Sequence, residues 1–246
     1  MPAPRFFCAT PLSAHARIEL PEALAHHALR VLRMKDGEAL TLFDGAGGEY
    51  PAVLEVQGKA GYARLGDFEP REAELAGRIV LAQGLPSGDK MDWVVEKAVE
   101  LGAAQVCPIA AQRSVPQLSG ARLDKRLAHW RRVAQSASEQ CGRNRLMDVD
   151  EPRTLAQWLA GPARGLRLLC HPEAETDLAG RLRGDAGLRA QPALTLLVGP
   201  EGGWSDQELE QARAAGVEAV RFGPRVLRTE TAGLALIAAS CAVLGW

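Results

Sequence analysis

The sequence predicts an α/β fold in which a parallel sheet follows a small, separate β domain. From residue 78 onward, short apolar stretches suited to strands alternate with longer stretches suited to helices, as in a parallel sheet covered on both faces. The first 74 residues instead contain short strand-like stretches around glycine turns, a pattern typical of a small barrel. A polar stretch over residues 70–74 is suited to a linker, so the predicted domains are 1–74 and 75–246.

The first domain is expected to contain one helix and three strands. Leu24, Ala28 and Val31 recur near helical spacing, which predicts a helix over residues 21–34. The turn-like sequence at 44–48 separates two of the apolar stretches. The predicted strands cover residues 39–43, 49–56 and 61–68.

The second domain is expected to alternate five strands with helices. Ser205 and Glu208 have the spacing of a capping box, and Gly216 follows as a stop signal, so one helix is predicted over 205–215. The other predicted helices cover 89–101, 123–140 and 230–244. The predicted strands cover 79–82, 105–109, 166–170, 194–198 and 219–222.

The last predicted helix is apolar on every side, because no charge follows Glu230 within it. A helix of this kind is normally buried all round. A domain of about 170 residues seldom encloses its final helix completely, and a subunit interface would cover the remaining face. The sequence therefore predicts a subunit interface on the C-terminal domain.

Composition excludes several classes of protein. The chain has 246 residues, 47% hydrophobic and 24% charged, with a net charge of −1, which is ordinary for a globular protein. Five cysteines without C-x-x-C spacing argue against a disulfide framework, and the histidines show no metal-ligand spacing. The first residues lack the apolar core of a signal peptide, and the apolar stretch 231–246 is too short to span a bilayer. We expect a cytoplasmic protein with neither a membrane nor a metal partner.

The charge is unevenly distributed along the chain. Residues 113–145 contain eight basic and two acidic residues, whereas residues 36–74 contain nine acidic and three basic ones. A local basic surface binds phosphate even when the whole protein is nearly neutral. The alternative is a solvated helix face with ordinary charge scatter.

Two loops in the last fifth of the chain stand beside predicted strands. The sequence Val-Gly-Pro-Glu-Gly-Gly at 198–203 lets a ligand approach the main chain closely, although it matches neither a Walker loop nor a dinucleotide fingerprint, and a plain turn is the alternative. The second loop, at 227–231, carries Arg228 and Glu230 between apolar elements. Charges buried there are costly unless they are paired or used, so this loop predicts either an internal salt bridge or one wall of an active site.

Together these loops resemble the RsmE family of 16S ribosomal RNA uridine N3-methyltransferases, within the SPOUT superfamily. The combination of Gly-Pro-Glu-Gly-Gly at 199–203 with Leu-Arg-Thr-Glu-Thr-Ala at 227–232 is the specific part of the resemblance. Further stretches resemble the family in the same order along the chain. They cover residues 26–33, 97–102, 130–133 and 138–145.

The resemblance implies a fold and a cofactor. Residues 1–74 would form a PUA-like barrel that docks RNA, and residues 75–246 a SPOUT domain with a C-terminal trefoil knot, a rare exception to unknotted topology. S-adenosylmethionine would lie bent in the knot of a homodimer, held by main-chain groups and apolar side chains. The implied cofactor-binding residues are His171, Leu197, Val198, Gly199, Glu201, Gly202, Gly203, Phe222, Gly223, Leu227, Thr229, Thr231 and Ala232.

The resemblance also implies a reaction, the methylation of uracil N3 at position 1498 of 16S ribosomal RNA in the small ribosomal subunit. Arg228 would stabilise negative charge on a uracil oxygen, and Glu230 would accept the N3 proton or orient Arg228. Glu201, Arg143 and a chain of water are second choices for this chemistry. The expected RNA-binding residues are Arg30, Arg33, Arg113, Arg131, Arg132, Arg143 and Arg145.

Two alternatives remain open at this point. One is an enzyme of the same superfamily that methylates a ribose 2′-hydroxyl of transfer RNA, with the same cofactor knot. The other is a non-catalytic RNA-binding or ribosome-assembly protein that uses a PUA-like module. Product analysis separates the first from an N3-methyltransferase, and a test of S-adenosylmethionine binding separates the second.

Overall fold

The computed structural model describes residues 3–58, 60–115, 119–183 and 185–246, which form two compact units. Unit 1 contains residues 1–74 together with 138–146, and unit 2 contains residues 75–137 and 147–246. The segment 138–146, expected within the second domain, therefore belongs to unit 1 by its contacts. The linear boundary between residues 74 and 75 stays a prediction.

Unit 1 is built on one five-stranded sheet with the order β1-β3-β4-β5-β2. β1 pairs parallel to β3, and the other pairs are antiparallel. The three predicted strands are confirmed, whereas β1 and β2 were missed because each has only three residues. Closure of the sheet into a barrel stays a prediction. The strands are β1 (Arg5–Phe7), β2 (Arg17–Glu19), β3 (Ala39–Phe43), β4 (Tyr50–Gln57) and β5 (Ala60–Leu65).

The predicted N-terminal helix is present in two parts. α1 (Glu22–His26) continues into a π-helical turn, η1 (His27–Val31). Leu24 and Ala28 are buried on this helix and join the apolar core beneath the sheet, which explains their helical spacing in the sequence. The predicted helix extended to residue 34, but Arg33 has a φ of 56°, which a helix does not tolerate.

Unit 2 is built on a six-stranded parallel sheet with the order β11-β9-β10-β6-β7-β8, which confirms the predicted α/β class. All five predicted strands are present, and the two-residue β8 adds an edge. The strands are β6 (Arg78–Gly84), β7 (Gln105–Ile109), β8 (Asp148–Val149), β9 (Leu166–Cys170), β10 (Ala193–Val198) and β11 (Glu218–Val220).

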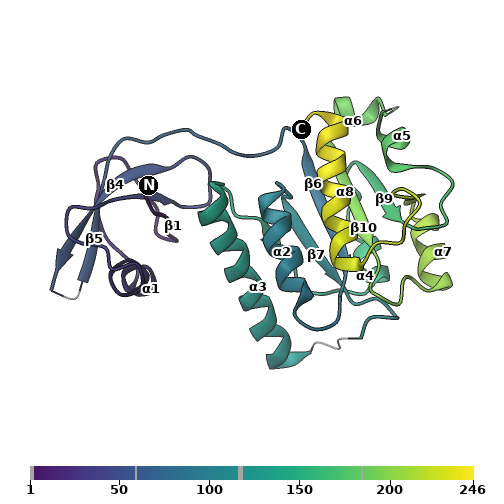
Figure 1. Cartoon of the computed structure of the whole chain (residues 1–246), viewed down its shortest axis with the longest axis horizontal. Helices are drawn as coiled ribbons and strands as arrows, with labels where there is room; N and C mark the ends of the chain where they lie inside the picture. The colour runs from purple at the N-terminus through teal and green to yellow at the C-terminus, as the bar shows by residue number, and fades with distance from the viewer. Residues whose placement is uncertain (1–2, 59, 116–118, 184) are drawn as a thin grey trace. The chain divides into compact units, whose positions relative to one another are not determined.

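Helices cover both faces of this sheet. Ala82, Cys107 and Leu197 lie on one face and pack in an apolar cluster with residues of α4 and α7. α2 and α8 lie together on the other face, in front of the sheet in Figure 1. α7 begins with the predicted capping box, because Ser205 and Glu208 each bond the other's backbone N–H. The helices are α2 (Lys90–Glu100), α3 (Gly120–Cys141), α4 (Leu155–Leu159), α5 (Leu178–Arg183), α6 (Gly187–Ala190), α7 (Asp206–Ala214) and α8 (Thr229–Leu244).

The final helix, α8, is buried on one side only. Leu236 and Ile237 are fully buried against the sheet, whereas Ala238 and Ala242 are exposed. The expectation that one chain does not enclose this helix completely is therefore confirmed, and a face of small apolar residues remains exposed. Within the described residues, no helix is long and apolar enough to cross a membrane.

Candidate active site

A cavity of about 500 Å³ opens where the parallel strands of unit 2 end, and we call it the carboxyl-end cavity. Ligands of open α/β sheets bind at this edge because the loops that follow the strands converge there. The predicted catalytic residues Arg228 and Glu230 both line it. So do ten of the predicted cofactor residues, namely His171, Val198, Gly199, Glu201, Gly203, Phe222, Gly223, Leu227, Thr229 and Ala232.

Three predicted cofactor residues do not line the cavity. Leu197 is fully buried and belongs to the apolar cluster beneath α4 and α7. Gly202 faces Arg113, because a Cβ built on it would lie 2.9 Å from the Cβ of Arg113. Thr231 is exposed on the first turn of α8. Successive side chains of a strand point to opposite faces of the sheet. Leu197 therefore points away from the cavity, which its neighbour Val198 lines.

Glycines let main chains approach one another at the cavity wall. A Cβ on Gly84 would lie 2.5 Å from the backbone nitrogen of Pro200, so the end of β6 and the loop after β10 are in direct main-chain contact. Gly203 has a φ of 68°, which favours glycine, and it turns the loop toward α7. Gly84 and Gly203 must both be glycine for the loop after β10 to keep this conformation.

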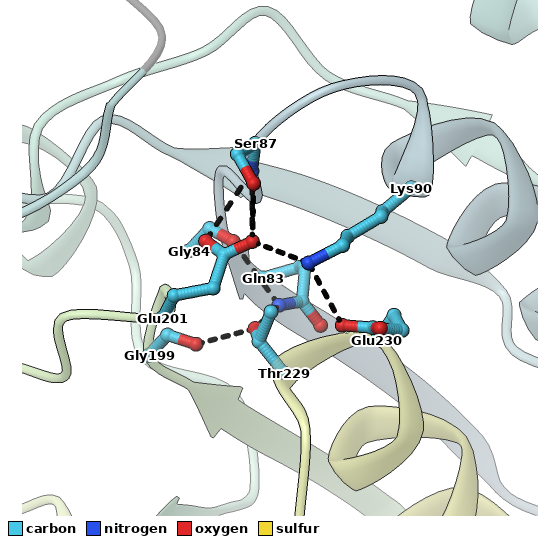
Figure 2. A network of polar contacts seen from close by, with 8 residues as sticks. All are labelled: Gln83, Gly84, Ser87, Lys90, Gly199, Glu201, Thr229 and Glu230. Carbon is cyan, nitrogen blue, oxygen red and sulfur yellow. Dashed lines mark hydrogen bonds and ion pairs between the residues drawn. The ribbon is translucent and has the colours of Figure 1, made fainter.

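A buried hydrogen-bond network fixes the ends of β6, β10 and α8 (Figure 2). The Nε2 of Gln83 donates to Thr229 Oγ1 at 2.8 Å and to the carbonyl oxygen of Gly84 at 3.1 Å. Thr229 in turn donates from Oγ1 to the carbonyl oxygen of Gly199 at 2.6 Å. Because Gln83 is fully buried, each of these bonds forms in a low-dielectric interior and holds the loops in one arrangement.

Glu201 accepts hydrogen bonds from three donor groups beside the cavity (Figure 2). Its Oε1 accepts from Lys90 Nζ at 2.8 Å, from Ser87 Oγ at 2.7 Å and from the Ser87 backbone N–H at 3.1 Å. Burial alone would raise the pKa of Glu201, but the bonds from Lys90 and Ser87 outweigh it and lower the pKa to about 2. Glu201 is therefore a permanent anion at neutral pH.

Lys90 connects Glu201 to Glu230 (Figure 2). Its Nζ lies 3.7 Å from Glu230 Oε2, an ion pair that is longer than a hydrogen bond. The hydrogen bond to Glu201 raises the pKa of Lys90, so this ammonium keeps its charge. Glu230 Oε2 is buried and accepts no hydrogen bond from the described residues. This oxygen therefore has the Lys90 ammonium as a charged neighbour but no hydrogen-bond donor among the described residues.

Arg228 and Glu230 do not form the internal salt bridge that the sequence left open. Arg228 is exposed and precedes the first turn of α8, whereas Glu230 is half-buried and pairs with Lys90. The arginine therefore contributes a positive charge to the cavity wall independently of the glutamate. The suggestion that Glu230 orients Arg228 is not supported, because Glu230 pairs with Lys90 instead.

The predicted RNA-binding arginines have different surroundings. Arg30, Arg33, Arg131 and Arg132 are exposed, and Arg113 lines the cavity, where it donates to the carbonyl oxygen of Trp204 at 3.1 Å. Arg143 is the exception. Its side chain is 4% exposed and its Nη2 lies 2.5 Å from Glu74 Oε2, so it stabilises unit 1 and is not available for RNA or for proton chemistry. Arg145 is exposed but is held by Glu72 at 3.1 Å.

Sequence reasoning missed Gln83, Ser87 and Lys90. Their segment shows no motif, but it directly follows β6, the strand beside β10. The carboxyl ends of adjacent parallel strands meet at one edge, so this loop was a candidate once the strand order was known. No group of three or more His, Cys, Asp or Glu residues in the described parts of the chain is placed to hold a metal ion.

Comparison with known families matches both parts of the chain. The model of an RNA methyltransferase domain covers residues 73–240, and that of an RNA methyltransferase PUA domain covers residues 20–64. Proteins named ribosomal RNA small subunit methyltransferase E are similar in sequence. The one from Synechocystis is 33% identical over 93% of this chain and 74% of its own length, and the one from Bacillus subtilis is 30% identical over 87% and 85%.

Solved structures agree with the sequence comparison. The Neisseria gonorrhoeae ribosomal RNA small subunit methyltransferase E, bound to S-adenosylmethionine, superposes with a TM-score of 0.88 at 37% identity over 98% of both chains. A Legionella pneumophila methyltransferase in complex with the same cofactor gives a TM-score of 0.89 at 31% identity over 98% of both chains. The cavity, the order of the domains and these relatives agree, and the chain belongs to the ribosomal RNA small subunit methyltransferase E family.

Proposed function

We propose that this protein transfers the methyl group of S-adenosylmethionine to N3 of a uridine in 16S ribosomal RNA, uracil 1498 by family resemblance. The observation that carries the proposal is the buried Glu230 oxygen, which has no hydrogen-bond donor among the described residues and lies in a cavity that Arg228 also lines. A proton acceptor and a cation beside one ligand site suit the methylation of an acidic N–H group. The cofactor is supported by the two similar structures that contain it.

The carboxyl-end cavity fits S-adenosylmethionine on three counts. Its volume of about 500 Å³ lies within the usual range for small-molecule sites, roughly 300–1,000 Å³. Trp204 Nε1 is buried without a partner among the described residues and is available as a donor. Gly199 and Gly203 line the cavity without a side chain, which lets an adenine ring approach the main chain closely. The cofactor would supply an activated methyl group on a sulfonium.

The chain's own residues would prepare the acceptor. Uracil N3 carries a proton between two carbonyl groups and becomes a good nucleophile only when that proton leaves. Glu230 would accept the proton, and a positioned base of this kind typically contributes about 10²–10⁴-fold. Arg228 would stabilise the negative charge that develops on a uracil oxygen. Lys90 would hold Glu230 in place through its ion pair.

The proposed RNA contacts combine the PUA domain with the basic surface of unit 2. Arg30, Arg33, Arg131 and Arg132 are exposed and would contact phosphates, so binding should weaken steeply as salt rises. We further propose that the exposed small residues of α8 pack against a second copy of the chain, and that the C-terminal segment forms the trefoil knot of its superfamily. The location of such a protein would be the cytoplasm, where its ribosomal substrate is assembled.

Methyl transfer from labelled S-adenosylmethionine to unmethylated small ribosomal subunits tests the proposal. Naked 16S RNA and bulk transfer RNA serve as parallel substrates, and mass spectrometry identifies the methylated nucleoside. We expect label in N3-methyluridine, mainly from the subunits. Label in a 2′-O-methyl nucleoside, or S-adenosylmethionine binding without transfer to any of these RNAs, would contradict the proposed specificity. No cofactor binding at all would favour the non-catalytic alternative.

A further inference from the structure

A second cavity, of about 330 Å³, lies at the opposite end of the same parallel sheet, and we call it the amino-end cavity. Its floor is one row of residues across four strands. Strand pairing aligns Thr195 of β10 with Arg167 of β9 and with Val80 of β6, and aligns Val80 with Gln105 of β7. Residues aligned in parallel strands point to the same face, so these side chains form a common surface.

The amino-end cavity carries an excess of positive charge. Of the residues that the structure describes, four arginines and one acidic residue, Asp150, line it. Both carboxylate oxygens of Asp150 already accept from Gln105 Nε2, at 2.9 Å each. Across the ranges that the structure describes, none of the four guanidinium groups forms an ion pair within 4.0 Å. The four are Arg78, Arg153, Arg164 and Arg167.

Two of the four arginines have hydrogen bonds that fix their direction. Arg78 Nη2 donates to Gln105 Oε1 at 2.8 Å, and Arg167 donates to the carbonyl oxygen of Ala215. Arg153 and Arg164 are exposed and sit on the connection between β8 and β9. The cavity therefore combines two arginines held by hydrogen bonds with two exposed arginines that have no acidic partner among the described residues.

The polar surface of the amino-end cavity ends abruptly along the strands. Two residues further on, the same face carries Leu169, Leu197, Ala82 and Cys107, which belong to the apolar core beneath α4 and α7. Burial raises the pKa of the Cys107 thiol to about 12, so this neighbour contributes no negative charge at neutral pH. Trp158 also lines the cavity. An apolar aromatic wall beside free guanidinium groups suits a ligand with a planar ring and an anionic group.

We propose that the amino-end cavity binds a nucleotide, with its phosphate on Arg153 and Arg164 and its base against Trp158. Guanidinium groups match phosphate oxygens in a two-point geometry, and bases stack on aromatic side chains. A volume near the lower limit for ligand sites favours a single nucleotide over a larger molecule. The nucleotide arrives either free or as one unit of an RNA strand. Within the described parts of the chain, the site shares no residue with the carboxyl-end cavity.

Calorimetric titration of the full chain with uridine monophosphate, inorganic phosphate and a short oligouridine tests this site. The test variant is Arg153→Gln with Arg164→Gln. The matched control is Arg183→Gln with Arg189→Gln, which removes two exposed arginines that do not line the cavity. We expect the test pair to weaken uridine monophosphate binding by at least about tenfold, because two charged hydrogen bonds are lost, and the control pair to leave it unchanged.

The variant Trp158→Leu distinguishes recognition of the base from recognition of the phosphate. It should weaken uridine monophosphate binding and leave inorganic phosphate binding unchanged, and its unfolding midpoint identifies any folding defect. Oligouridine that binds more tightly than the mononucleotide, with the same sensitivity to the arginine pair, would identify an RNA strand as the source, whereas equal affinities would identify the free nucleotide. No saturable binding, or equal losses in both arginine pairs, would overturn the proposal. Because the readout is binding, it is independent of the proposed methyl transfer.

Discussion

The two ends of the parallel sheet in unit 2 are both hollowed, but their charged side chains are organised differently. At the carboxyl-end cavity, Lys90 lies 2.8 Å from Glu201 and 3.7 Å from Glu230, and Gln83 fixes the main chain beside them. At the amino-end cavity, Arg153 and Arg164 have no acidic partner within 4.0 Å among the described residues. One end is a fixed network of opposite charges, and the other is an uncompensated positive surface.

This difference indicates two kinds of task. Fixed donors and acceptors reduce the reorganisation that a reaction requires, so the carboxyl-end network suits chemistry. Free guanidinium groups attract anions but do not define the position of a reacting atom, so the amino-end cavity suits binding. Substitutions at the first cavity should therefore change the rate of methyl transfer, and substitutions at the second should change affinity.

The largest expected effect follows the loss of the proposed base. Glu230→Gln should lower the single-turnover rate of methyl transfer by about 10²–10⁴-fold, because the amide cannot accept the N3 proton. Binding of uridine monophosphate at the amino-end cavity should not change. Glu230→Asp, which keeps a carboxylate, should retain more activity than the glutamine variant. A rate within a few-fold of the parent for Glu230→Gln would remove Glu230 from proton transfer and favour water.

A somewhat smaller effect is expected for the cation of the same loop. Arg228→Ala should lower the rate by about 10²–10³-fold if its guanidinium stabilises the uracil anion. Arg225→Ala is the matched control, because Arg225 is also exposed and lines the same cavity. Equal losses in the two variants would show a general effect of positive charge and would contradict a specific role for Arg228. The two variants are compared by their single-turnover rates of methyl transfer at saturating RNA.

The close approach of two main chains predicts a stability effect at the carboxyl end. Gly84→Ala would place a Cβ 2.5 Å from the backbone nitrogen of Pro200, and overpacking of this kind typically costs about 1–3 kcal/mol. Thermal unfolding should report the loss, and S-adenosylmethionine binding should weaken as the loop moves. Gly61→Ala is the control, since its Cβ would meet neighbours at 3.4 Å or more. An unchanged unfolding midpoint for Gly84→Ala would show that the loop is not held there.

The two cavities also differ in how far the sequence predicts them. Most of the carboxyl-end cavity was predictable, because the loops at 198–203 and 227–231 carry glycines and charges that resemble a known family. Lys90 was not predictable from local pattern, since its partners Glu201 and Glu230 are more than a hundred residues away. Only the strand order brings the end of β6 beside the end of β10.

The amino-end cavity shows the opposite case. Arg78, Arg167 and Thr195 stand near the first positions of their strands and look like ordinary strand ends in the sequence. Their meeting depends on strand register, which local sequence does not reveal. For a related reason Arg143 was misassigned. It lies in a basic stretch, but folding places it against Glu74, and the charge pattern alone could not show this burial.

The smallest expected effect concerns the pH dependence of the fixed network. The folded-state pKa of Glu201 is about 2, below its ordinary value of 4.5, so ionised Glu201 stabilises the folded state above pH 4.5. This contribution should disappear as the pH falls from 4.5 to about 2. Glu201→Gln should therefore lower the unfolding midpoint at pH 7 and have almost no effect on it near pH 2. The control Glu151→Gln, at an exposed glutamate, should change the unfolding midpoint little at either pH. A difference between parent and Glu201→Gln that stayed constant over this range would mean that packing, not charge, explains the role of Glu201.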